Sequence, residues 1–345
     1  MYFITYASPK TVIMPTDYSK LPKIELHLHL DCSLSYEAVK KLVPGTTQST
    51  YNNEYKIAGN CTDLADYIGR AESAIRLMQT SENLELVVDD LFQQLQEDRV
   101  LYAEIRFAPL LHTREGLTAD EVVKTVSEVT ERCVQETGIE AGIILCTLRH
   151  YSEEESLETV NLVEKYIGST RVCGFDMAGD EAGYPIDNHV SAFEKARHHQ
   201  IPCTSHAGEA CGAKSVEETL SRLKPRRIGH GVRSLEDADL IKKLILDDIH
   251  LEVCPTSNVK TNVFDDIRSH NIDRIYRRGI SMSVNTDGRT LSDVTLADEY
   301  QKLEENFEWG HSHFKKCNLE AIRHAFTTDG VKQRIREKLI QAYGS

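Results

Sequence analysis

The chain has 345 residues and a formal net charge of −14 at pH 7. Hydrophobic residues make up 40% of it and charged residues 27%, which is an ordinary balance for a globular protein with a large core. The acidic balance argues against a nucleic-acid partner, because surfaces that bind phosphate backbones are usually basic. No apolar run is long enough to span a bilayer. We therefore expect a soluble protein that acts on a small molecule.

Nine cysteines are scattered singly along the sequence. Their odd number and the lack of closely spaced pairs indicate reduced thiols rather than a disulfide framework. Residues 1–20 contain short apolar patches but no basic segment leading into a sustained apolar run, so no secretory signal is expected. The sequence predicts a cytoplasmic protein, and no obligate protein partner is evident.

Two histidines stand in the short apolar segment Leu26-His27-Leu28-His29-Leu30-Asp31. Side chains alternate across a strand, so both imidazoles would lie on the same face. Buried imidazoles without partners are costly, whereas one metal ion would accept a nitrogen atom from each. The segment favours a metal site, and a pair of hydrogen-bonded core histidines is the alternative.

Short apolar runs alternate with helical signals along most of the chain. Strands that alternate with helices predict parallel pairing with right-handed crossovers, and one large domain of this kind is expected over residues 1–345. The number of runs predicts an α/β fold, an eight-stranded (β/α)8 TIM barrel. The runs cover residues 24–30, 101–108, 139–148, 172–178, 201–206, 227–232, 249–253 and 280–285.

Several patterns predict helices between these runs. Capping boxes begin at Thr118, Ser152 and Ser215. The connection spanning residues 31–100 is an elaborated loop that could cover a site, and residues 318–345 predict a helical tail. Apolar residues at helical spacing are interpreted as ordinary helix packing. This interpretation includes Leu64, Tyr67 and Ile68, for which a lid is the alternative. The stripes interpreted in this way are Leu84, Val87, Val88, Leu91 and Leu95; Val122, Val126, Val129 and Cys133; and Leu64, Tyr67 and Ile68.

Polar residues end four of the predicted strands. In a barrel of this kind the active site lies at the carboxyl ends of the strands, so these groups should converge. Three neutral imidazoles and one carboxylate would hold a zinc ion and leave a position open for water. Glu209, three residues after His206, would lie close to that ion, where a proton shuttle is needed. The groups are His27 with His29, His206-Ala-Gly-Glu209, Gly229-His230-Gly231 and Asn285-Thr286-Asp287.

The sequence resembles the adenosine deaminase family from about residue 21 to its end. The resemblance implies a (β/α)8 barrel with one zinc ion that hydrolyses adenosine and 2′-deoxyadenosine to inosine and 2′-deoxyinosine, with release of ammonia, in purine salvage. Six motifs in the order of the family carry the resemblance: His27-Leu-His29-Leu-Asp31, Met177-Ala-Gly179-Asp-Glu181, His206-Ala-Gly-Glu209, Gly229-His230-Gly231, Cys254-Pro-Thr-Ser-Asn258 and Asn285-Thr286-Asp287.

The resemblance also implies a role for each matching residue. Glu209 would protonate purine N1, and His230 would orient or deprotonate the attacking zinc-bound water. The backbone N–H of Gly179 would meet purine N3, and Asp31 would meet the 5′ hydroxyl of the ribose. The implied zinc ligands are His27, His29, His206 and Asp287.

Two positions depart from the pattern of the family. Many members carry a second Asp after the metal-binding one, where it contacts purine N7, but this chain has Gly288 followed by Arg289. Arg289 is not expected to replace that carboxylate, so recognition of N7 should be relaxed. Cys32 stands where Gly is common, and we interpret it as a small side chain that fills space.

Several other functions remain open from the sequence. A two-metal hydrolase would commonly bridge its metals with a carboxylated lysine on the fourth strand, but residues 172–179 contain no Lys. The motifs of the cytidine deaminase fold are absent. AMP, N6-methyl-AMP, adenine or a modified adenosine would share the chemistry, and Lys40 and Lys41 are candidates for contacting a phosphate. Nickel, cobalt or iron could replace zinc. An inactive binding protein on the same scaffold is the remaining alternative.

Overall fold

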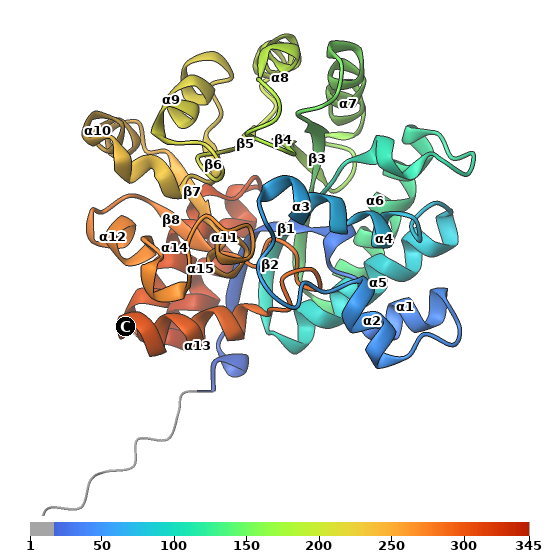
Figure 1. Ribbon diagram of the computed structural model, residues 1–345, viewed down its shortest axis with the longest axis horizontal. Coiled ribbons are helices and arrows are strands. Elements are labelled where there is room, and N and C mark those ends of the chain that lie inside the picture. The colour runs from blue at the N-terminus through green and yellow to red at the C-terminus, as the bar shows by residue number, and fades with distance from the viewer. Residues whose placement is uncertain (1–16, 345) are drawn as a thin grey trace, which may run out of the picture.

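The computed structural model describes residues 17–344, in which parallel strands alternate with helices. The strands surround a central axis, and most of the helices lie outside them (Figure 1). The eight strands are β1 (Lys23–His29), β2 (Val100–Phe107), β3 (Glu140–Leu148), β4 (Val172–Ala178), β5 (Thr204–Ala207), β6 (Arg227–His230), β7 (His250–Val253) and β8 (Met282–Val284).

The helices fall into three groups. Five lie between β1 and β2: α1 (Tyr36–Leu42), α2 (Gln48–Glu54), α3 (Leu64–Arg70), α4 (Glu72–Ile75) and α5 (Ser81–Glu97). Seven connect the later strands: α6 (Ala119–Thr137), α7 (Glu153–Tyr166), α8 (Val190–His198), α9 (Ala213–Arg222), α10 (Ala238–Leu246), α11 (Pro255–Lys260) and α12 (Ile272–Arg277). Three follow β8: α13 (Leu296–Phe307), α14 (His311–His324) and α15 (Asp329–Tyr343).

The strands form two four-stranded parallel sheets, β1-β2-β3-β4 and β5-β6-β7-β8. Single parallel bridges join the sheets at both edges, Phe175 with Cys203 and Leu28 with Asp287. The predicted TIM-barrel architecture is therefore confirmed, and each predicted apolar run overlaps one strand. The elaborated connection after the first strand and the helical C-terminal region are also confirmed.

The helices form where the apolar and capping patterns predict them, with one exception. The predicted stripes of α5 and α6 are buried against the sheet and against each other. Thr118 and Ser152 begin α6 and α7 with complete capping boxes. The third predicted box was wrong, because α9 begins two residues earlier and Ser215 lies inside it. The Ser215 hydroxyl instead donates to Glu181, 2.5 Å away.

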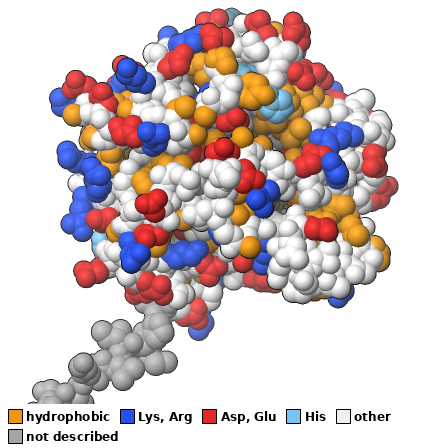
Figure 2. All heavy atoms as spheres, in the orientation of Figure 1, with side chains coloured by type: hydrophobic (Ala, Val, Ile, Leu, Met, Phe, Trp, Pro, Cys, Tyr) orange, Lys and Arg blue, Asp and Glu red, His pale blue; other side chains and the backbone are white. Residues whose placement is uncertain are grey.

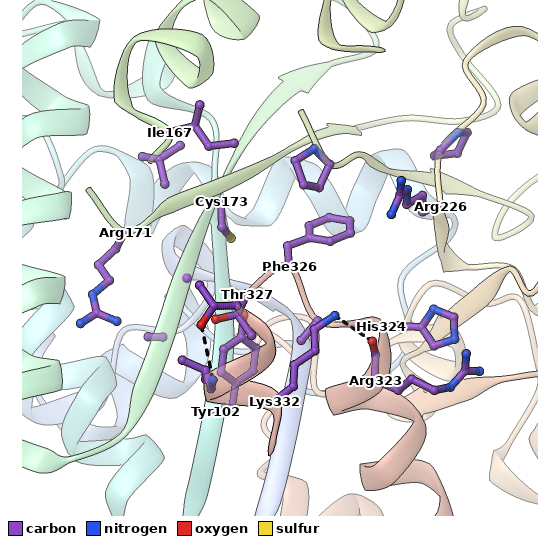
Figure 3. Close-up of a pocket in the computed structure, with 18 of the residues that line it drawn as sticks. Tyr102, Ile167, Arg171, Cys173, Arg226, Arg323, His324, Phe326, Thr327 and Lys332 are labelled. Carbon is purple, nitrogen blue, oxygen red and sulfur yellow. Dashed lines mark hydrogen bonds between the residues drawn. The ribbon is translucent and has the colours of Figure 1, made fainter. Parts of the chain in front are cut away.

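The segment between α14 and α15 covers the amino end of the barrel. Phe326 packs against the backbone of Gly174, where a Cβ atom would approach its ring to 2.7 Å, and the guanidinium of Arg227 lies 3.7 Å from the ring centroid. A cavity of about 880 Å³ surrounds Phe326 at this end (Figure 3). It is lined by residues that precede or begin β3 to β7, so it lies opposite the carboxyl ends of the strands.

The surface seen in Figure 2 mixes Lys and Arg with Asp and Glu instead of gathering one sign of charge. Within residues 17–344, no helix is long and apolar enough to cross a membrane. Residues 1–16 lie outside the described part of the chain, and they include most of the segment in which no secretory signal was predicted.

Candidate active site

The four predicted ligands meet at the carboxyl end of the barrel. β1 delivers His27 and His29 on one face, β5 delivers His206, and Asp287 follows β8. The backbones of β1 and β8 are tied directly, because His29 N–H donates to the Asp287 carbonyl (2.7 Å) and Asp287 N–H donates to the His27 carbonyl (3.0 Å). Residues that are far apart in the sequence thus converge in one cluster.

The spacing of the cluster fits a single ion. Asp287 Oδ1 lies 3.3 Å from Nε2 of both His27 and His29, and Nε2 of His29 and His206 are also 3.3 Å apart. Ligand atoms 2.0–2.1 Å from a tetrahedral ion lie about 3.3 Å from one another. Nε2 of His27 is buried and makes no hydrogen bond. A nitrogen-rich set with one carboxylate suits zinc or a similar transition metal.

The electrostatics favour metal-ready protonation states at His29, His206 and Asp287, whereas hydrogen bonds to Asp287 and Glu252 outweigh burial and raise the pKa of His27. Burial lowers the pKa of His29 and of His206, so both imidazoles are neutral at pH 7. Burial also opposes ionisation of Asp287, but the adjacent His27 and His29 hold the pKa of its carboxyl well below the ordinary value. Neutral imidazoles and an ionised carboxylate are the protonation states that metal binding requires.

Beneath the ligands lies a buried charged layer that the sequence reading missed. Glu252 Oε2 lies 2.9 Å from Nδ1 of His27, and Asp176 Oδ2 lies 3.1 Å from Nδ1 of His206. Arg106 pairs with both carboxylates, at 2.7 and 2.9 Å. Such partners fix the orientation of metal-binding histidines. The available signal was the charged residues inside three otherwise apolar strands, Glu104 and Arg106 in β2, Asp176 in β4 and Glu252 in β7.

Glu209 lies deep in the site, 3% exposed, on the turn after β5. Burial, with Asp287 and Glu181 nearby, raises the pKa of its carboxyl well above the ordinary value, which favours the protonated form. The turn is held by the Glu181 carboxylate, which accepts the backbone N–H groups of Gly208 (2.6 Å), Glu209 (3.0 Å) and Cys211 (2.8 Å). Glu181 belongs to the motif Met177-Ala-Gly179-Asp-Glu181, but the sequence did not indicate its role.

His230 ends β6 beside Glu209. Its Nε2 lies 3.4 Å from Glu209 Oε2, and the amide of Asn258 lies 3.0 Å from its Nδ1. Burial holds the pKa of His230 well below the ordinary value, so the imidazole is neutral. His230 and Asp287 both have left-handed backbones, with φ of 61° and 67°. This conformation is costly for residues other than glycine and concentrates at functional sites.

A cavity of about 100 Å³ opens over the cluster. Asp31, Gly179, Glu209, His230 and three of the ligands line it. The interpretation of Leu64, Tyr67 and Ile68 as ordinary helix packing is incomplete: Tyr67 packs in a hydrophobic cluster, but all three residues also line this cavity from α3. The apolar face of the helix contacts the cavity because α3 lies across the barrel mouth (Figure 1).

Comparisons with known proteins agree with this geometry. A family model described as adenosine deaminase matches residues 22–342. An adenosine deaminase of Clostridium acetobutylicum is 35% identical over 326 residues, which cover 92% of this chain and 97% of that protein.

The chain belongs to the adenosine deaminase family.

Two solved structures share its fold. Adenine deaminase from Arthrobacter aurescens has a TM-score of 0.86 at 23% identity, covering 93% of this chain and 98% of that one. An amidohydrolase from Burkholderia ambifaria with bound Zn has a TM-score of 0.87 at 20% identity, covering 97% and 95%. As a member of the adenosine deaminase family, the chain is a hydrolytic deaminase, and metal dependence is general in this family.

The two positions that depart from the family pattern, Cys32 and Gly288, lie side by side in this deaminase. A Cβ atom added to Gly288 would lie 2.7 Å from the Cβ atom of Cys32. Arg289 does not line the cavity, because its guanidinium pairs with Glu25 (2.7 Å) and Asp98 (3.1 Å). The expectation that Arg289 does not replace the missing carboxylate is thus supported.

A second group of possible ligands, His27, His230 and Cys254, overlaps the first. Burial raises the pKa of the Cys254 thiol well above the ordinary value. Metals bind the thiolate rather than the thiol, so the cluster that contains Asp287 is the better candidate for a deaminase metal centre.

Proposed function

We propose that this chain hydrolyses adenosine and 2′-deoxyadenosine to inosine and 2′-deoxyinosine with release of ammonia, using one zinc ion held by His27, His29, His206 and Asp287. The spacing of about 3.3 Å among the ligand atoms and the lowered pKa values of His29 and His206 support the ion. When bound, zinc would lower the pKa of water toward neutrality and supply the hydroxide needed for attack.

Glu209 and His230 are the proposed catalytic residues. Glu209, whose carboxyl pKa is raised by burial, would donate a proton to purine N1 and make C6 more electrophilic. His230, neutral and 3.4 Å from Glu209, would orient the attacking water and accept its proton. This pairing of a raised carboxyl pKa with a lowered imidazole pKa provides one acid and one base at the same pH.

Asp31 and Gly179 are the proposed substrate-binding residues. Both residues line the cavity. Asp31 follows β1 and Gly179 follows β4, whereas Glu209 follows β5. Gly179 has a φ of 102°, which a side chain rarely adopts, so its backbone N–H is presented without a Cβ atom beside it. That N–H would donate to purine N3, and Asp31 would accept from the ribose 5′ hydroxyl.

The choice of substrate rests on the absence of cationic side chains from the described residues that line the cavity. Among the described residues that line it, none is Lys or Arg. A nucleotide phosphate needs cationic or N–H-rich contacts. Lys40 and Lys41 do not provide them, because both are exposed on α1 and outside the cavity lining. A nucleoside therefore fits better than AMP or N6-methyl-AMP, and the full set of catalytic groups argues against an inactive binding protein.

The test is a substrate panel with zinc-loaded protein. Adenosine, 2′-deoxyadenosine, AMP, N6-methyl-AMP and adenine are followed by the loss of aminopurine absorbance, with ammonia measured independently. We expect kcat/KM for both nucleosides to exceed that for the nucleotides and adenine by at least about tenfold, equivalent to ~1.4 kcal/mol. A preference for AMP would contradict the assignment. A role in purine salvage, a cytoplasmic location and organisation as one domain over residues 1–345 stay predictions.

A further inference from the structure

A buried pair of hydroxyl groups, from Tyr67 and Ser292, lies beside Gly288, and Tyr67 is one of the residues that line the cavity. The Tyr67 hydroxyl is 2.8 Å from Ser292 Oγ, and it would lie 3.2 Å from a Cβ atom added to Gly288. A side chain at position 288 would therefore start next to the phenol oxygen. Tyr67 is 5% exposed and lines the cavity together with Glu209 and Asp287.

The order of the strands determines which edge of a bound 6-aminopurine would face Tyr67. N1 and N7 lie on opposite sides of C6, so a ring with C6 at the ligand cluster and N1 at Glu209 directs N7 away from Glu209. Glu209 follows β5, whereas Cys32 follows β1 and Gly288 follows β8. β1 and β8 adjoin each other, and β1 lies across the eight-stranded barrel from β5. The N7 edge would thus face the Tyr67 hydroxyl.

We propose that Tyr67, supported by Ser292, is the residue that recognises purine N7 in this chain, an inference that rests on the proposed function. An unprotonated ring nitrogen accepts a hydrogen bond, so its partner must donate. A phenol keeps its proton at neutral pH. The Ser292 hydroxyl can donate to the Tyr67 oxygen, which leaves the phenol proton available for N7.

The cavity offers few competing donors at this edge. The Cys32 thiol is a weak donor, and Arg289 is held by Glu25 and Asp98 outside the cavity lining. Asp287 belongs to the proposed ligand set, and its second oxygen accepts from Ser257, 2.6 Å away. Tyr67 is therefore the best placed of these groups to donate to N7.

The test compares adenosine with 7-deazaadenosine, in which a carbon atom replaces N7. We expect the zinc-loaded wild type to prefer adenosine in kcat/KM by about threefold to tenfold, the scale of one neutral hydrogen bond. Tyr67→Phe should bring this ratio close to one, because kcat/KM should fall for adenosine and stay unchanged for 7-deazaadenosine. An unchanged ratio in Tyr67→Phe, or a ratio that disappears in Cys32→Ala instead, would overturn the proposal.

Tyr51→Phe is the matched control. Tyr51 is 3% exposed, its hydroxyl donates to the Leu34 carbonyl (2.9 Å), and it does not line the cavity. Loss of this buried hydroxyl should leave the substrate ratio unchanged. If Tyr67→Phe does not fold, Ser292→Ala tests the proposal instead. This variant keeps the Tyr67 phenol and removes the Ser292 hydroxyl that is hydrogen-bonded to it. The ratio should fall by about half or more, and an unchanged ratio would again overturn the proposal.

A binding measurement separates this inference from the proposed function. If the wild type deaminates none of the aminopurines, the proposed function fails. Calorimetric titration with inosine and 7-deazainosine still tests Tyr67, because both ligands occupy the site without turnover. The wild type should bind inosine more tightly by about threefold or more, and Tyr67→Phe should bind both equally. Equal binding by the wild type would overturn the role of Tyr67.

Discussion

A Cβ atom added to Gly288 would lie 2.7 Å from the Cβ atom of Cys32, so the two positions share one small space. The next nearest atoms to that added atom, the Cys32 carbonyl oxygen and the Tyr67 hydroxyl oxygen, are both at 3.2 Å. The two departures from the family pattern are therefore linked sterically. The chain that carries Cys in place of Gly at position 32 has no room for a carboxylate at position 288.

We expect Gly288→Asp alone to lower the free energy of unfolding by about 1–3 kcal/mol, the usual cost of overpacking a buried site. Adding Cys32→Gly should recover at least half of that loss, because it removes the 2.7 Å contact. Urea unfolding of the two single variants and the double variant measures the coupling. Cys61→Gly combined with Gly288→Asp is the control, since Cys61 is buried but is not among the nearest neighbours of an added Cβ atom. Additive effects at positions 32 and 288 would contradict the shared space.

Glu209→Gln should keep the fold and the metal while kcat falls by at least about 100-fold, the scale of a positioned acid or base. The amide fills the same volume but cannot deliver a proton to N1. The measurement combines steady-state kinetics with elemental analysis of each variant. Glu217→Gln, on the exposed face of α9, is the control and should match the wild type. Loss of metal from Glu209→Gln would show instead that Glu209 is a ligand.

The sequence predicted the barrel and the four converging strand ends because both depend on local patterns. Each strand is a short apolar run, and parallel strands place their carboxyl ends together. His27 and His29 share a face for the same reason. The predicted capping box at Ser215 failed because its hydroxyl donates to Glu181, a residue on a different connection. Such a competing contact leaves no mark near Ser215 in the sequence.

The layer beneath the metal ligands could not be assigned from the sequence for a related reason. Arg106, Asp176 and Glu252 lie on three different strands, and their pairing depends on the registers of the closed barrel. The role of α3 was also missed, because an apolar helical face looks the same whether it packs on a core or lines a cavity. Both assignments depend on the positions of strands that are distant in the sequence, which local patterns do not reveal.

The metal requirement is open to a direct test. We expect about one zinc ion per chain by elemental analysis, loss of deaminase activity on chelation, and recovery when zinc is restored. His29→Ala should lower both the metal content and kcat, because one of four ligands is removed. His150→Ala, at an exposed position outside the cavity lining, should change neither. Full activity of the metal-free protein would contradict the proposed chemistry, and another bound ion would identify a different native metal.

Glu299 should make the stability of the protein depend on pH. It is fully buried on α13, where Oε1 accepts the backbone N–H of Thr256 (2.9 Å) in the first turn of α11, and Oε2 has no hydrogen-bond partner. Burial raises the pKa of its carboxyl from 4.5 to about 7. Since the folded state binds this proton more tightly than the unfolded chain, the stability it contributes is complete below pH 4.5 and is lost as the pH rises through about 7.

Glu299→Gln should remove that pH dependence. Between pH 4.5 and 7 the wild-type free energy of unfolding should contain a contribution from Glu299 that falls by at most about 1.4 kcal/mol per pH unit, and the amide cannot titrate. Urea unfolding at pH 5, 6, 7 and 8 gives the two slopes, and Glu305→Gln on the exposed face of the same helix is the control. The difference in slope is the decisive quantity, because the amide also changes hydrogen bonding at every pH. Identical slopes for Glu299→Gln and the wild type would show that Glu299 ionises in the folded protein as readily as in the unfolded chain.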